Sequence, residues 1–231
     1  MTRTARVIIT CARLDSNSVL RSFVRALMAA ALATLITVVA GGIDGDSATF
    51  DQATLAASKS LEAKLQILGA TDAPPTATYP AVVITVYEAN SYLKVHSGEF
   101  LPPGVHTPAL GVQPEQAMAS ADVDFDELSR SYPNPNDMGP KILAAMFHGT
   151  QHVTVTAKIQ SGDTGVLVQI ESVEVGSMNV PNWLIDLVIQ NFLQPRYKFD
   201  LSKPLPYPDH VKKIVLGSGQ VTFLRGPKTG K

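Results

Sequence analysis

The chain has little cysteine, few aromatic residues and few charges. Among its 231 residues the single cysteine is Cys11, the single tryptophan is Trp183, and aromatic residues make up 6%. A mature chain without the N-terminal segment that holds Cys11 could form no disulfide, no thiolate nucleophile and no cysteine-based zinc site. With 45% hydrophobic and 17% charged residues, the composition excludes a disordered chain and a protein with many membrane spans.

A long uncharged run, from Ala26 to Ala40, lies near the N-terminus and follows a set of arginines. Its length fits the apolar region of a signal peptide and is short for a membrane span of about 20 residues. Val38 and Ala40 are small enough for the two positions that a signal peptidase reads. We therefore expect residues 1–40 to be a signal peptide cleaved before Gly41, or else an uncleaved anchor. The remaining chain, 41–231, is then periplasmic or secreted, or tethered to the membrane.

Charge is unevenly distributed along the chain. The net charge is −1, but residues 41–231 hold 14 basic and 19 acidic residues, a net of −5, and the part from Arg196 onward holds eight basic and two acidic residues, a net of +6. A basic end favours an anionic partner such as a membrane surface, or it is an ordinary solvated terminus. The candidate membrane-surface residues are Lys212, Lys213 and Arg225. Because Lys212 and Lys213 are adjacent on a predicted strand, at most one of them shares a face with Arg225.

Four segments have the pattern of helices. Thr85 and Glu88 form a capping box, in which each side chain binds the backbone of the other residue at a helix start. Pro181 fits the first position of another helix. The predicted helices cover residues 51–68, 85–95, 140–147 and 183–193.

Alternation of apolar and polar residues predicts the strands. Residues 153–160 and 166–175 form the clearest hairpin, and its alternation shifts after Ser172, as a β-bulge would cause. Further strands are predicted at 81–84, 105–112, 116–125, 211–216 and 220–224. Because tight turns join antiparallel strands, we expect an α+β fold in which helices cover one face of a curved antiparallel sheet, in a single domain from 41 to 231.

The histidines and aspartates do not form a convincing metal site. His148 and His152 are four residues apart, but a predicted helix-to-strand junction separates them and no glutamate accompanies them as in a zinc motif. Asp122, Asp124 and Asp126 alternate like the start of a calcium loop, but the glycine and glutamate that such a loop requires are missing. The sequence contains no nucleophile elbow, phosphate loop or dinucleotide fingerprint. We therefore expect no metal, no cofactor and no enzyme activity.

The predicted helix 183–193 is apolar around most of its circumference. Such a helix is either fully buried or lines an apolar groove, and the sequence leaves both alternatives open. The candidate ligand-binding residues are Trp183, Leu184, Ile185, Val188, Ile189 and Phe192.

Turn, cap and hairpin markers recur along most of the chain. They are Glu88–Leu93 (EANSYL), Leu101–Val105 (LPPGV), Val175–Pro181 (VGSMNVP), Phe199–Pro206 (FDLSKPLP), Val211–Ile214 (VKKI) and Gly219–Val221 (GQV). Together these segments resemble exported bacterial proteins related to the tubular lipid-binding (TULIP) superfamily, including the envelope family implicated in lipomannan and lipid handling. None of the segments is a catalytic signature.

The resemblance implies a strongly bent antiparallel sheet wrapped on a long helix, enclosing an apolar groove for an acyl chain or a polyisoprenoid. The expected function is therefore to bind or shuttle a lipid in the cell envelope without bond chemistry. The alternative is a structural or interaction module of an envelope complex. The expected partners are a lipid or other apolar ligand, a membrane surface and an envelope protein, and not a nucleic acid.

Overall fold

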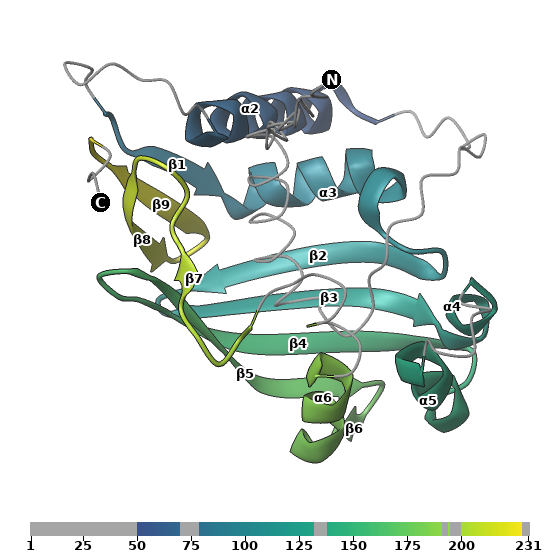
Figure 1. Cartoon of the computed structure of the whole chain (residues 1–231). Helices are drawn as coiled ribbons and strands as arrows, with labels where there is room; N and C mark the ends of the chain where they lie inside the picture. The colour runs from purple at the N-terminus through teal and green to yellow at the C-terminus, as the bar shows by residue number, and fades with distance from the viewer. Residues whose placement is uncertain (1–49, 70–78, 132–137, 191–193, 195–199, 228–231) are drawn as a thin grey trace, which may run out of the picture.

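A curved antiparallel sheet forms the centre of the molecule (Figure 1). The computed structural model describes residues 50–69, 79–131, 138–190, 194 and 200–227. In the large sheet four long strands follow one another in chain order: β2 (Val105–Gln113), β3 (Gln116–Asp124), β4 (Thr150–Ser161) and β5 (Gly165–Val175). Two short strands, β6 (Met178–Asn179) and β7 (Leu205–Pro206), pair with the two ends of the outer edge of β5.

A second sheet has three strands in the order β1–β9–β8. These are β1 (Val82–Thr85), β9 (Gln220–Arg225) and β8 (Val211–Gly217). All pairings in both sheets are antiparallel. Helices and antiparallel sheets together confirm the predicted α+β class.

The helices are α2 (Gln52–Gly69), α3 (Val86–Phe100), α4 (Phe125–Ser131), α5 (Met138–Met146) and α6 (Asn182–Val188). The capping box is confirmed, since the Thr85 side chain accepts from the Glu88 N–H and the Glu88 carboxylate accepts from the Thr85 N–H. Helix α3 runs on to Phe100, past the predicted end at residue 95. Pro181 is the N-cap of α6 and not its first helical residue, which corrects the prediction by one position.

One face of the large sheet is buried over most of β3, β4 and β5. Its side chains come from alternate positions of three strands: Ala119, Ala121, Val123, Val153, Val155, Ala157, Ile159, Val166, Val168, Val173 and Val175. Between Ile170 and Ser172 the pairing with β4 leaves Glu171 without a partner residue, which confirms the predicted bulge. The extra residue keeps Val168 and Val173 on the same face although five positions separate them.

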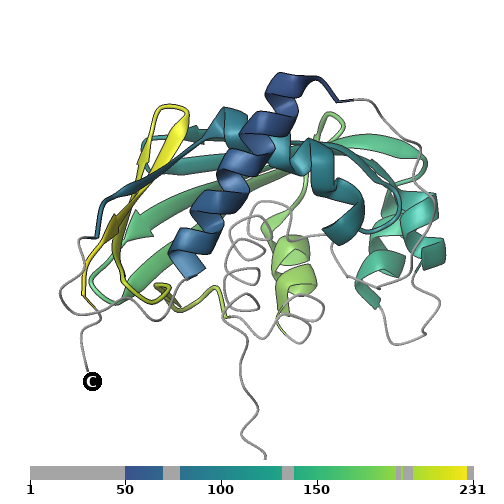
Figure 2. The same cartoon turned by 90° about the horizontal axis from the view of Figure 1, so that it is seen from above.

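Two layers cover this buried face, one at each end. At one end the sheet packs against Phe125 of α4, Leu143 of α5 and Leu184 of α6. At the other end it packs against Phe223 of β9, together with residues of β8, β1 and the end of α2. Figure 2 shows α6 on the concave side of the sheet, between the small sheet and α5.

The outer edge of β2 is closed by a side chain of α3. The Asn90 amide donates to the carbonyl of Leu110 at 3.0 Å and accepts from the N–H of Leu110 at 2.7 Å. The N–H of Gly219, in the β8–β9 turn, donates to the carbonyl of Val112 at 2.9 Å. These groups occupy backbone positions that a further strand would otherwise use.

No helix among the described residues is long and apolar enough to cross a membrane. The run Ala26–Ala40 and the expected cleavage before Gly41 lie outside the described residues. The expectation of a signal peptide or anchor therefore stays a prediction.

Candidate functional site

A groove of about 470 Å³ lies between α6 and β5. Its α6 wall is a single stripe, formed by Asn182, Ile185, Asp186 and Ile189. These residues share one side of the helix because positions three and four apart lie above one another. Leu201 and Ser202 also line the groove.

The opposite wall is the edge of strand β5 rather than its face. Four consecutive residues, Leu167 to Ile170, line the groove. Side chains of neighbouring residues in a strand point to opposite faces, so a surface that all four touch contains the backbone edge between those faces. The groove therefore combines a strand edge with a helix stripe whose apolar part is Ile185 and Ile189.

Among the described residues, strand pairing occupies this edge only at its two ends. At one end β7 pairs with Gly165 and Val166, and at the other β6 pairs with Glu174 and Val175. The N–H of Val180 also donates to the carbonyl of Val173 at 2.8 Å. Within the described ranges, no strand pairs with the segment from Leu167 to Ser172 on the side away from β4.

The polar side chains of the groove are mainly amides. Gln169, Gln190, Gln194 and Asn182 line it, and Asp186 is the one charged side chain among the lining residues that the structure describes. Amides can donate and accept, whereas a carboxylate only accepts. The lining therefore suits a ligand that carries both donors and acceptors beside its apolar part.

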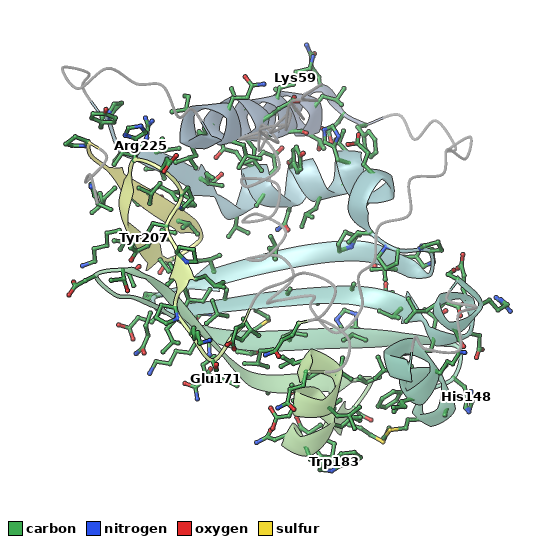
Figure 3. The ribbon with its side chains drawn as sticks, viewed as in Figure 1. Lys59, His148, Glu171, Trp183, Tyr207 and Arg225 are labelled. Carbon is green, nitrogen blue, oxygen red and sulfur yellow. The ribbon has the colours of Figure 1, made fainter. Side chains whose placement is uncertain are left out.

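The structure divides the predicted ligand-binding residues into separate groups. Ile185 and Ile189 line the groove, and their role in binding a ligand stays a prediction. Leu184 and Val188 do not, because both are 0% exposed and pack in the core against α4, α5 and the sheet. Trp183 is 63% exposed and projects from α6 away from the sheet (Figure 3). Phe192 lies outside the described residues.

Leu184, Ile185 and Val188 border a second space that is wholly apolar in its lining. It is closed in by Phe125 of α4 and Leu143 of α5, and holds only about 10 Å³. That is about the room that one water molecule needs. This space is a packing void and not a binding site.

Arg225, one of the three predicted membrane-surface residues, is half-buried and makes contacts within the protein. The Arg225 guanidinium donates to the carbonyl of Ile67 at 3.0 Å and lies over the ring of Tyr79, 5.7 Å from its centre. It thereby ties β9 to the end of α2 (Figure 3). Lys213 is exposed, whereas Lys212 is half-buried at the bulge in β8. Docking of this end on a membrane stays a prediction that rests on the lysines.

The three alternating aspartates do not form one site. Asp124 accepts from the N–H groups of Asp126 at 3.0 Å and Glu127 at 2.9 Å, so it caps α4. Asp122 accepts from Thr107 and His152, and these hydrogen bonds lower the pKa of Asp122. Asp122 and Asp124 therefore each hold neighbouring structure together.

The two histidines lie on either side of the start of β4. His148 precedes the strand and lies 3.7 Å from Asp126, whereas His152 lies within the strand and is 2.8 Å from Asp122. Among the residues described, no group of three or more histidine, cysteine, aspartate or glutamate side chains is placed to hold a metal ion.

Comparisons of this chain with protein-family models, with curated proteins and with solved structures found no match. The resemblance to the tubular lipid-binding superfamily therefore stays an expectation. A proposal about function therefore rests on the α+β fold and the groove.

Proposed function

We propose that this protein is an exported carrier that binds an apolar lipid chain in the groove between α6 and β5, without bond chemistry. The observation that supports this proposal is the groove itself, lined by Ile185 and Ile189 on the helix side and also by Leu201. Its volume of about 470 Å³ falls in the range of about 300–1,000 Å³ that is usual for ligand sites.

Burial of hydrocarbon supplies the affinity in this proposal. Each methylene moved out of water contributes about 0.8 kcal/mol, so about ten buried methylenes contribute about 8 kcal/mol. Loss of translational and rotational freedom offsets part of that gain. The remaining binding free energy suits a carrier, which must release its ligand as well as bind it.

The test is native mass spectrometry of the purified protein, before and after substitution in the groove. Ile189→Asp places a carboxylate on the apolar stripe and is expected to abolish co-purification of lipid. Ile189 is half-buried, whereas Ile185 is only 5% exposed, so Ile189 is the position where the fold tolerates the change better. Trp183→Asp, on the same helix but outside the groove lining, is the matched control and should retain lipid. A folded Ile189→Asp variant with the lipid content of the wild type would contradict the proposal.

A second candidate function, an interaction module of an envelope complex, is favoured by a different observation. Trp183 is 63% exposed and Met178, five residues earlier, is 57% exposed. Exposed tryptophan is unusual on a solvated surface and is enriched at protein interfaces. If this function is the main one, Trp183→Ala should shrink the native complex extracted from cells while the lipid content is unchanged.

A further inference from the structure

The groove contains backbone groups of β5 that pair with no described strand and that a plain hydrocarbon chain cannot satisfy. In an antiparallel strand, alternate residues direct their N–H and C=O groups to each side. One side of β5 is used by β4. On the other side, about two of the four residues from Leu167 to Ile170 direct both groups toward the groove.

An acyl chain lying against this edge would remove water from those backbone groups without forming hydrogen bonds to them. A buried backbone group without a hydrogen-bond partner is rare in proteins because leaving it unpaired is costly. The ligand that suits the groove therefore carries amide-like donors and acceptors along its length, in addition to its apolar chain.

We infer that the ligand is a short N-acylated peptide, bound with its peptide part as an added strand on β5. This inference rests on the proposed function, because the acyl chain occupies the same apolar stripe of Ile185 and Ile189. The peptide part pairs with the edge from Leu167 to Ser172, in continuation of the pairing that β7 and β6 already make at its two ends. A strand edge facing a helix is a geometry in which extended peptides add to a sheet.

The length and charge of the peptide follow from the same residues. The segment Leu167–Ser172 has six residues, which corresponds to an extended length of about 20 Å. Asp186 is the one charged side chain of the described lining, so a basic residue suits the bound peptide and an acidic one does not.

The experiment measures binding of an N-palmitoyl hexapeptide of alanine with one lysine to the full delipidated chain, with palmitate as the reference. Two isomers of the peptide carry N-methyl groups on alternate amides, one isomer on the odd positions and the other on the even positions. Only one of these two sets can face β5 in an added strand. We expect that isomer to lose about tenfold or more in affinity, since at least two hydrogen bonds are removed, and the other isomer to bind within about threefold of the parent.

Hydrogen exchange gives an independent readout on the protein. The parent peptide should protect backbone amides within Leu167–Ser172, and palmitate alone should not. Equal affinities of the two methylated isomers, or equal protection by palmitate, would overturn the inference and leave lipid binding intact. Failure of both palmitate and the acyl peptide to bind would overturn the proposed function together with it.

Discussion

Replacing Glu88 by glutamine should destabilise the folded chain by an amount that depends on pH. The Glu88 side chain is 11% exposed and one of its oxygens accepts from Ser60 Oγ at 2.6 Å and from Lys64 Nζ at 2.5 Å. Its other oxygen accepts from the N–H of Thr85 at 2.9 Å and from the Thr85 hydroxyl at 3.0 Å. The carboxylate thus caps α3 and joins it to α2. A glutamine has a single acceptor oxygen and cannot serve both sides.

The size of the effect follows from the pKa of Glu88. Burial by itself raises this pKa, but the hydrogen bonds from Lys64, Ser60 and Thr85 outweigh burial and lower the pKa from 4.5 to about 2. That difference corresponds to about 3 kcal/mol of stability. Because the pKa is lower in the folded state than in the unfolded state, the stabilisation is complete above about pH 5 and is lost as the pH falls toward 2.

The assay is urea unfolding of the wild type and of Glu88→Gln, followed by circular dichroism at pH 7 and at pH 3. The expected loss in unfolding free energy is about 3 kcal/mol at pH 7 and about 1.5 kcal/mol at pH 3. At pH 7 the melting temperature should fall by about 6–12 °C for a chain of this size. Glu62→Gln, an exposed change on α2, is the control and should stay within about 0.5 kcal/mol of the wild type. A loss below about 1 kcal/mol at pH 7, or an equal loss at both pH values, would refute the reasoning.

Three further predictions concern the edges and the N-terminus. Asn90→Ala removes the amide that closes the edge of β2. It should lower the free energy of unfolding by about 1–3 kcal/mol and promote self-association, as measured by urea unfolding and by light scattering. An unchanged monomer of wild-type stability would contradict this. Gly165→Ala places a Cβ 2.2 Å from the Leu205 carbonyl oxygen and should lower the free energy of unfolding by about 1–3 kcal/mol. The control Gly162→Ala, whose Cβ would have its nearest atom at 3.5 Å, should be tolerated. Equal melting temperatures of the two variants would count against this prediction. Exported protein should begin near Gly41, and N-terminal sequencing that finds the upstream arginines would instead favour an anchor.

Elements whose cause is local could be predicted from the sequence. The capping box of α3 depends on Thr85 and Glu88, three residues apart, and the break in alternation at Ser172 marked the bulge at Glu171. Helix α4 was missed, although Asp124 and Glu127 have the spacing of a helix N-cap and its third residue. That signal was hidden because Asp124 also continues the alternation of β3, so the strand pattern seemed to run on through Phe125.

The groove could not be predicted because distant segments build it. Leu201 and Ser202 line it, although they come long after β5 in the chain. The sequence did indicate that α6 is apolar on more than one side. The side of α6 that meets the core depends on where α5 packs, and no local sequence pattern predicts that position. Hence the sequence placed Ile189 and Leu184 together as candidates, whereas the structure has Ile189 in the lining of the groove and Leu184 in the core.

If α6 binds a ligand as proposed, folding and binding are coupled there, and the degree of coupling differs between its positions. Leu184 and Val188 hold the helix against the core, so truncating Leu184 to alanine costs about 2–5 kcal/mol and displaces the helix that forms one wall of the groove. Ile185 touches both the core and the groove, so no substitution there separates stability from affinity. Ile189 lies at the helix end and meets the groove with part of its surface still exposed. The proposed binding should therefore be altered independently of the fold at Ile189, or through the backbone edge of β5 by changing the ligand instead of the protein.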